Sequence, residues 1–306
     1  MIIRRSIGVV IIMLVLAVNS AYATNYNVLT DMGSSSKMIA IGNIEGFSDS
    51  AAGVLENPAS LTNTKKTSVS LFTTTLMDDA IYTAGAVSVT VPFGKLGLGY
   101  MGVGVSGIPY GSLDQSNQVK LDGYASYKSE ILKLSYQFNP RKNISVGASL
   151  IQYSSDFFDV HAKGYNVELG TLIDMQPFQL SIVGRNLMGN SVVLFTGGDA
   201  NGTEKLATNL IVSGKYHWEE MDVLTQFKNI EDTTLFSYGV IYTPRFFTSI
   251  QLLGGFKNYR VLDTTKSGYT IGLNLRVKDV QFQYAYEKSD YYVYDSKNYF
   301  SVSAGF

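Results

Sequence analysis

The chain has 306 residues, of which 16% are charged, and its formal net charge is −1. Soluble domains carry roughly 25% charged residues, so the composition argues against a surface that faces water on all sides. A near-neutral chain also lacks the basic face that binding to nucleic acid requires. The chain contains no cysteine and only two histidines, His161 and His217. We therefore expect no disulfide, no metal site and no cofactor.

Residues 1–23 are typical of a secretory signal peptide. Arg4 and Arg5 give a positive start, and residues 7–18 form an apolar stretch. This stretch is shorter than the roughly 20 residues that a membrane-spanning helix needs. An A-x-A cleavage site ends at Ala23. We expect export and cleavage near Ala23, with a retained signal anchor as the alternative.

Residues 24–66 follow the predicted signal peptide and differ from the rest of the chain. They are rich in Gly, Ser, Ala and Asn, and apolar and polar residues do not alternate in them. We therefore treat them as a segment of their own, separate from the strands that begin near residue 67.

From about residue 67 the dominant period is two. In residues 280–287, for example, the apolar side chains of Val280, Phe282, Tyr284 and Tyr286 alternate with smaller or polar ones. Side chains of a strand point alternately to opposite faces, so each such run has one apolar and one polar face. The pattern predicts fourteen strands, at residues 67–77, 79–92, 94–105, 125–138, 143–154, 160–174, 177–187, 205–218, 221–229, 234–243, 247–258, 267–277, 280–288 and 297–306.

The connections between these runs alternate in length. Every second one is a tight turn, such as residues 139–142 and 278–279, and most of the others are longer. The longer connections are residues 106–124, 188–204, 259–266 and 289–296. Strands that zigzag across a bilayer have short turns on the periplasmic side and longer loops outside. The sequence therefore predicts an all-β protein, an antiparallel transmembrane β-barrel of about 14 strands over residues 67–306.

The final residues alternate apolar and small side chains at Phe300, Val302, Ala304 and Phe306. A terminal strand of this form resembles the recognition signal of bacterial outer-membrane barrels. It implies that the barrel-assembly machinery and outer-membrane lipid are partners of the chain. The expected location is the bacterial outer membrane.

Four charged residues fall on the polar faces of predicted strands: Glu168, Arg185, Arg276 and Glu287. An Arg exposed to lipid near the bilayer midplane would cost ~2–4 kcal/mol, so we expect these side chains to point into the lumen. Two interpretations are open. The residues form an ion-pair network that braces the inner wall, or they bind a hatch or a ligand.

The sequence offers little catalytic chemistry. Gly102, Gly104 and Gly107 form a G-x-G-x-x-G string, but a loop follows them instead of the helix that nucleotide binding needs. We interpret these glycines as small barrel residues where strands bend or a hatch approaches. No G-x-S-x-G nucleophile elbow is present. We therefore expect that the protein is not an enzyme.

Within residues 24–66, a Gly-rich stretch leads through Asp49 and its neighbours to Asn57, Pro58 and Ala59. This run resembles the N-terminal signature of the FadL-like and PorV/PorQ outer-membrane families. Further similar stretches are residues 144–153, 184–189 and 282–289, which read ISVGASLIQY, GRNLMG and FQYAYEKS.

The resemblance implies a fourteen-stranded barrel in which residues 24–66 fold inside, or lie below, as a hatch. A flexible periplasmic leader is the alternative for this segment. Three functions remain open. The first is a FadL-like passage of hydrophobic or amphipathic small molecules across the outer membrane. The second is a PorV/PorQ-like accessory of type IX-like protein secretion, with a secretion-system protein as partner. The third is a structural surface barrel.

Overall fold

In the computed structural model, the described part of the chain comprises residues 29–76, 80–113, 118–158, 160–188, 192–196, 202–230, 233–261, 264–289 and 297–306. The predicted signal peptide and its cleavage site lie outside the described residues. No helix among the described residues is long and apolar enough to cross a membrane.

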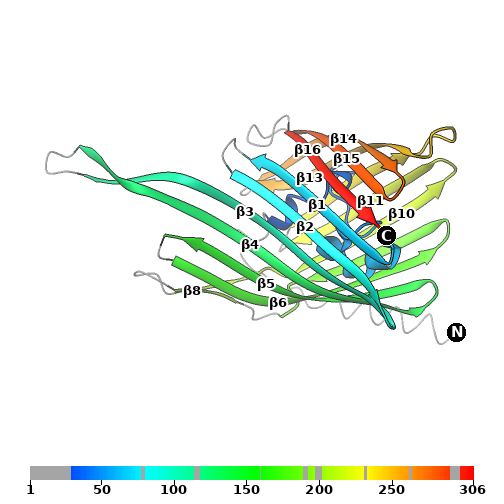
Figure 1. The fold of residues 1–306 in the computed structure, drawn as a ribbon, viewed down its shortest axis with the longest axis horizontal. Helices are drawn as coiled ribbons and strands as arrows, with labels where there is room; N and C mark the ends of the chain where they lie inside the picture. Colours follow the sequence, from blue (N-terminus) through cyan, green and yellow to red (C-terminus); the bar gives the residue numbers. More distant parts are fainter. Residues whose placement is uncertain are drawn as a thin grey trace.

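Sixteen strands of the described chain form one sheet, and fourteen of them close into an antiparallel barrel (Figure 1). Consecutive barrel strands are neighbours, and β5 pairs with β6 to complete the circle. The barrel strands are β1 (Thr67–Leu76), β2 (Ala80–Val91), β3 (Gly94–Leu113), β4 (Val119–Arg141), β5 (Ile144–Phe157), β6 (Val160–Met175), β7 (Phe178–Arg185), β10 (Asn209–Trp218), β11 (Met221–Ile230), β12 (Thr233–Tyr242), β13 (Ile250–Val261), β14 (Thr264–Val277), β15 (Val280–Ser289) and β16 (Lys297–Gly305). The predicted fold class is therefore confirmed.

The barrel closes where the first strand meets the last. β1 pairs antiparallel with β16, with Phe72 opposite Ser301. The backbone N–H of Phe306 donates to the carbonyl of Thr67 at 2.8 Å, and the reverse bond is 3.0 Å long. The alternating segment that contains Phe300 and Val302 thus forms the closing strand, and both of these side chains face outward.

The strands alternate between a face turned to the lumen and a face turned outward. In β12, Leu235 and Ile241 are buried inside, whereas Phe236, Tyr238 and Tyr242 are exposed on the outer face. The same alternation gives the barrel an apolar outer belt of Leu, Val, Ile, Phe and Tyr. Such a belt fits contact with lipid hydrocarbon.

The β3–β4 connection differs from the prediction. Residues 106–124 were expected to form a loop, but β3 and β4 continue through most of them as a long hairpin that projects beyond the barrel (Figure 1). The register shifts between Ser106 and Ile108, and Gly107 there has a φ of 75°. This irregularity breaks the two-residue alternation, which is why periodicity alone ended the strands too early. Gly107 therefore marks a strand bend.

A second difference concerns the expected loop 188–204. It contains a short hairpin of β8 (Val192–Thr196) and β9 (Gly202–Lys205), which extends the sheet at β6. β7 pairs with β6 and β10 only as far as Arg185, which lies opposite Glu168 and Asn209. Beyond that point β6 pairs with β8 instead, so the wall changes its strand partners there.

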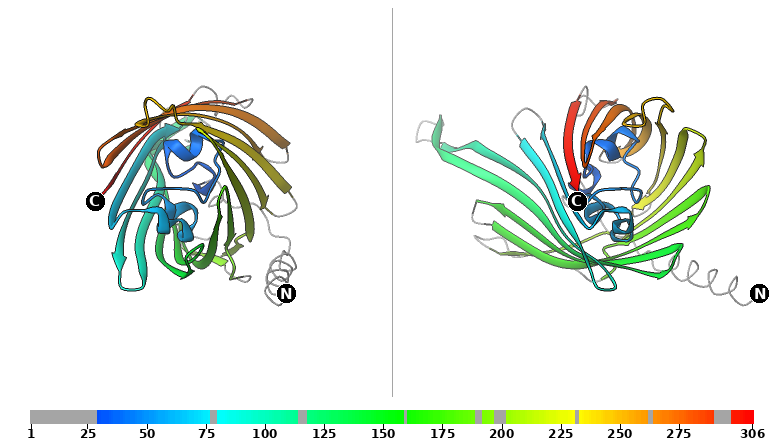
Figure 2. Two further views of the ribbon diagram at one scale, coloured as in Figure 1. Left: turned by 90° about the vertical axis from the view of Figure 1, so that its right-hand side faces the viewer. Right: turned by 45° about the vertical axis from the view of Figure 1, so that its right-hand side comes forward.

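The segment before β1 lies inside the barrel (Figure 2). Its elements are α3 (Ser36–Ala40), α4 (Gly53–Glu56) and the 3-10 helix η1 (Pro58–Asn63). Together with the residues between them, the described residues 29–66 are called the hatch below. Ile39, Val54 and Leu61 are fully buried between hatch and wall.

Glycines allow the hatch to approach the wall closely. A Cβ on Gly255 of β13 would lie 2.2 Å from the backbone nitrogen of Gly42. Gly42 itself has a φ of 79°, in the left-handed region that glycine adopts without strain. The backbones of hatch and barrel are therefore in contact here, with no side chain between them.

Candidate functional site

A buried cluster of charges joins the hatch to the wall. Arg185 donates to Glu45 of the hatch at 2.8 Å and also to Glu168. Lys133 donates to Glu168 at 3.0 Å, and all four side chains are almost completely buried. Glu168 and Arg185 are direct neighbours in the β6–β7 register, which explains why they meet.

The same two cations also hold hatch backbone. Lys133 donates to the carbonyl of Leu55 at 3.0 Å, and Arg185 donates to the carbonyl of Glu56 at 3.0 Å. These carbonyls lie at the end of α4, where helix geometry leaves them without partners inside the helix. Burying ions is costly, and only close pairing with further hydrogen bonds offsets the lost hydration. The cluster meets that condition by bonding both side chains and backbone.

Lys228 of β11 makes a second connection on the same side of the barrel. It pairs with Asp31 and, at 3.4 Å, with Glu45. Glu45 thus lies between Arg185 and Lys228. Burial would raise the pKa of the Glu45 carboxyl, but these two cations hold it below its ordinary value.

Asp49 is the centre of a third connection. It accepts from Lys37 of the hatch at 3.0 Å, and from Arg276 at 2.8 Å and Gln281 at 3.2 Å on the wall. Burial opposes ionisation of Asp49, but Lys37 and Arg276 lower its pKa to about 2. Arg276 is half-exposed, so this link is partly solvated.

Asn57, Pro58 and Ala59 form the start of η1. The Asn57 side chain accepts from the backbone N–H of Ala59 at 2.9 Å and caps the turn. Its amide donates to the hydroxyl of Ser181 on β7 at 2.9 Å. Pro58 packs against Gly147, where a Cβ would lie only 2.8 Å from the proline ring. The motif therefore fastens η1 to β5 and β7.

Glu287 lies apart from the other predicted lumen residues. It pairs with Lys257 of β13 at 2.8 Å and accepts from the Tyr299 hydroxyl at 3.2 Å. The structure thus does not bring Glu168, Arg185, Arg276 and Glu287 into one site. Glu168 and Arg185 share the buried cluster, Arg276 joins Asp49, and Glu287 belongs to a wall pair.

Glu56 is a buried carboxylate of the hatch, and its surroundings oppose its ionisation. Burial raises its pKa to about 7, and the neighbouring Glu45 acts in the same direction. The Ser34 hydroxyl donates to it at 2.8 Å. The group therefore titrates within the ordinary range of solution pH.

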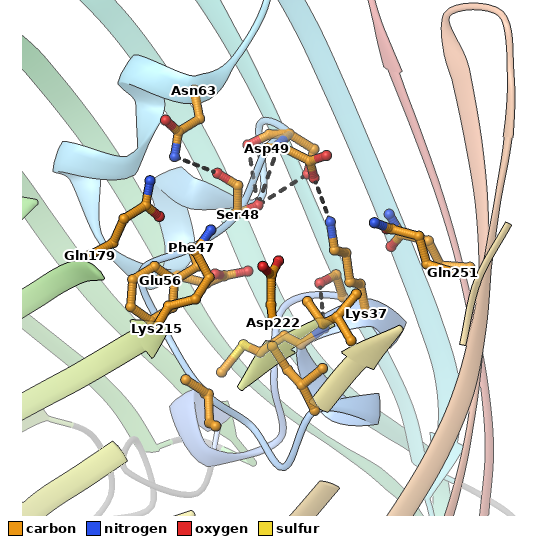
Figure 3. A pocket seen from close by; sticks show the side chains of 17 residues that line it. Lys37, Phe47, Ser48, Asp49, Glu56, Asn63, Gln179, Lys215, Asp222 and Gln251 are labelled. Atoms are coloured by element: carbon orange, nitrogen blue, oxygen red, sulfur yellow. Dashed lines mark hydrogen bonds and ion pairs between the residues drawn. The ribbon is translucent and has the colours of Figure 1, made fainter. Parts of the chain in front are cut away.

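A cavity of about 220 Å³ lies between the hatch and the ends of β7, β10, β11 and β13 (Figure 3). Figure 3 shows Lys37 and Asp222 on the wall of this space, with Asp49 bonded to Lys37. Its remaining labelled lining is Phe47, Ser48, Glu56, Asn63, Gln179, Lys215 and Gln251. The lining is largely polar, so in this state the cavity suits water or a polar group better than a hydrocarbon.

A different surface lies on the inner wall of β1 to β5, toward the β3–β4 hairpin. Most of its inward side chains are apolar and buried, and Thr74 and Ser129 are buried polar residues among them. We call the apolar residues the apolar inner wall: Phe72, Leu76, Tyr82, Met101, Ile131, Ile151 and Tyr153. The Phe72 and Tyr82 rings lie 5.8 Å apart. The lumen of a water-filled porin is polar, whereas this part of the lumen favours apolar contact.

The hatch covers the apolar inner wall. Leu29 and Ile39 are buried in the same apolar cluster. The hydroxyl of Tyr82 donates to the carbonyls of Leu29 at 3.2 Å and Gly33 at 2.9 Å. These bonds fix the start of the described hatch over the apolar surface.

Among the described residues, no group of three or more His, Asp or Glu side chains is placed to hold a metal. His161 bonds to Asp156 at 2.6 Å and His217 to Asp222 at 2.7 Å, and both histidines are exposed near strand ends. Each pair joins neighbouring strands within a hairpin. Neither sits in the buried cluster.

Three residues of these contacts are not among those expected from the sequence: Glu45, Lys133 and Lys228. Lys133 lies on the polar face of its strand and could have been chosen by the argument used for Arg185. Glu45 lacks such a signal, because its partner Arg185 is 140 residues away in the chain.

No family model matches the chain, and no curated protein matches its sequence. Its structure is similar to that of the Pseudomonas putida toluene transporter TodX, with a TM-score of 0.63 and 12% identity. The likeness covers 90% of this chain and 99% of TodX. A Pseudomonas aeruginosa FadL homologue has a TM-score of 0.57 and 10% identity, over 94% of this chain and 99% of the homologue. The FadL-like resemblance of the sequence is therefore confirmed at the level of the fold, a closed fourteen-stranded barrel shared with FadL-family transporters.

Proposed function

We propose that the chain is an outer-membrane channel for the passive passage of hydrophobic or amphipathic small molecules. The apolar inner wall carries the proposal. It places buried Leu, Ile, Met and aromatic side chains in a lumen that a channel for polar solutes would line with polar ones. The shared fold supports the same assignment, because TodX is a toluene transporter.

Passage of this kind requires no catalytic group. It requires an apolar surface that a ligand can reach and a hatch that can shift from it. The hatch meets the apolar inner wall through packing and the two Tyr82 hydrogen bonds, whereas ion pairs to the wall fasten Asp31 and Glu45. A ligand that replaces Leu29 on the wall would offset the lost packing with its own apolar contacts.

The change of strand partners beyond Arg185 gives such a ligand a route toward the membrane. Tyr153 of the apolar inner wall donates to Asn186 at 2.6 Å, and Asn186 in turn donates to the carbonyl of Ala207 at 2.8 Å. Leu206 and Ala207 are buried beside these bonds. We propose that apolar ligands leave the lumen here, where side-chain hydrogen bonds replace part of the backbone hydrogen bonding between neighbouring strands.

Uptake measurements test the function. Cells lacking related channels would express the wild type, L76D or T265D, and uptake of radiolabelled toluene and of a long-chain alkanoate would be followed. L76D places a charge on the apolar inner wall and should slow uptake at least about tenfold. T265D puts the same charge on an exposed position of β14 and should behave as the wild type.

Equal uptake by L76D and the wild type would contradict the role of the apolar inner wall. Wild-type uptake no faster than in cells without the chain would contradict the function itself. In that case a pull-down for secretion-system proteins would separate the secretion accessory from the structural barrel.

A further inference from the structure

The side chain of Asn209 is completely buried and makes no hydrogen bond. Its exposure is 0%, and neither its amide nitrogen nor its carbonyl oxygen has a partner among the described residues. It is the only described side chain in which both a donor and an acceptor are buried without partners. Such a group lowers stability, because it loses its hydration and gains no bond in return. Its presence therefore needs a reason other than stability.

Asn209 lies at the edge of the proposed exit. It is the first residue of β10, and it pairs with Arg185, the last residue of β7. The hydroxyl of the adjacent Thr208 donates to the carbonyl of Asn186 at 3.0 Å, and the Asn186 amide donates to the carbonyl of Ala207. The pairing of β7 with β10 thus ends at Asn209, directly beside the side-chain hydrogen bonds that replace it.

The side chain of Asn209 points into the barrel. Asn209, Ile211 and Ser213 are the buried positions of the alternating strand β10. The Ser213 hydroxyl donates to Gln226, whose amide donates to the carbonyl of Asn43 in the hatch. Side chains two residues apart lie on the same face of a strand, so Asn209 faces the lumen as Ser213 does. A ligand that moves from the apolar inner wall to the proposed exit would pass this amide.

The surroundings of Asn209 limit the chemical group that it can bind. Arg185, its neighbour on β7, is already paired with Glu45 and Glu168. An ionised ligand would add an unpaired charge to this buried region, which is costly. A neutral hydroxyl has one O–H donor and an oxygen that accepts. It therefore complements the carbonyl and the amide N–H of Asn209, whereas a hydrocarbon offers neither.

We propose that Asn209 binds the hydroxyl group of a neutral amphipathic ligand, such as a phenol or an alcohol, as the ligand leaves the lumen. The amide accepts from the ligand hydroxyl and donates to its oxygen, so both of its buried polar atoms gain a partner. The residue thereby favours a hydroxylated ligand over a hydrocarbon of the same shape. This inference rests on the proposed function and narrows its ligand class.

The test compares uptake of p-cresol with uptake of toluene, because these two molecules differ by one hydroxyl. Cells of the same background would express the wild type or N209L, in which leucine keeps the branching of asparagine and removes the amide. The ratio of p-cresol to toluene uptake should fall about fivefold in N209L, which corresponds to one neutral hydrogen bond. Toluene uptake itself should remain at the wild-type level.

The same substitution at another buried asparagine is the matched control. Asn274 of β14 is 1% exposed, and its amide donates to Gln251 at 2.8 Å. N274L should lower the midpoint of unfolding in detergent and leave the uptake ratio unchanged. N209L should keep or raise that midpoint, because it removes two polar atoms that have no partners. Heat-modifiability on a gel confirms that each variant is folded.

A second measurement does not depend on uptake. The side-chain amides of asparagine are isotope-labelled and followed by NMR in detergent, and the signal that is absent from N209L belongs to Asn209. Addition of p-cresol should shift this signal, and toluene should not. An unmoved signal, or an uptake ratio equal in N209L and the wild type, would overturn the proposal.

Two further outcomes separate the inference from the proposed function. An equal loss of p-cresol and toluene uptake in N209L, with a lower midpoint of unfolding, would overturn the inference by giving Asn209 a purely structural role. Wild-type cells that take up neither molecule would contradict the proposed function. In that case the NMR measurement would still decide whether Asn209 binds a hydroxyl group.

Discussion

The inner wall of the barrel has two regions that hold the hatch by different means. At Arg185, Glu168 and Lys133, buried ion pairs and hydrogen bonds reach both side chains and backbone of the hatch. Over the apolar inner wall, packing of Leu29 and Ile39 and the hydroxyl of Tyr82 hold the hatch, and Asp31 beside them pairs with Lys228. Apolar contacts are non-directional and a ligand can replace them, whereas a buried charge must keep its partner. The comparison suggests an anchored half and a displaceable half of one hatch.

Removing the central cation should have the largest effect. R185M leaves Glu45 and Glu168 buried without their shared partner and should cost about 3–5 kcal/mol of stability. The free energy of unfolding in detergent measures it. R276M removes the same residue type from a half-exposed pair with Asp49 and should cost less than about 1 kcal/mol. Equal losses in the two variants would remove the distinction between an anchored and a solvated contact.

A smaller change affects the displaceable half. Y82F removes the hydrogen bonds to the carbonyls of Leu29 and Gly33, and should cost about 1 kcal/mol. Hydrogen exchange should increase in residues 29–38 and stay unchanged near Glu45. Y136F, which removes an exposed bond to Phe93, is the control. Faster exchange spread over the whole hatch would show that the two halves move as one.

A further prediction concerns pH. The folded state raises the pKa of Glu56 from 4.5 to about 7, so it binds a proton more readily than the unfolded state does. The stability from protonated Glu56 is fully present below pH 4.5 and is lost as pH rises to about 7. E56Q cannot ionise, and its stability should change less between pH 5 and pH 8. An identical pH profile in E56Q and wild type would assign the dependence to another group.

Much of the barrel can be predicted from the sequence because each strand has one face toward lipid and one toward the lumen. These two environments impose a strict alternation of side chains along the strand. The predicted start of β3, at residue 94, and the predicted strand at 160–174 agree closely with β3 and β6. Alternation failed beyond Ser106, where the Gly107 bulge shifts the register and the hairpin leaves the bilayer. There, neither lipid nor a closed lumen enforces the pattern.

The hatch contacts could be anticipated only in part. The inward direction of Arg185 follows from its strand, since a charge in lipid is costly. Its partner Glu45 does not, because nothing in the local sequence around Glu45 specifies the distant strand that it meets. In the sequence, Gly255 likewise cannot be distinguished from other strand glycines, and its contact with Gly42 arises only in the folded barrel. Pairings across the lumen depend on strand order and register together.

The β1–β16 seam has a consequence for the order of assembly. Its partners lie at opposite ends of the barrel sequence, as Phe72 and Ser301 show, so it joins residues of very large sequence separation. Such contacts form late, because the intervening chain must first be ordered. The hatch directly precedes β1 and fills the interior with backbone held against Gly255 and Arg185. Enclosing it after the seam has formed would require threading it into a barrel that is already closed. The seam is therefore expected to close around a hatch that is already in place, which makes the hatch a template for the barrel as well as its plug.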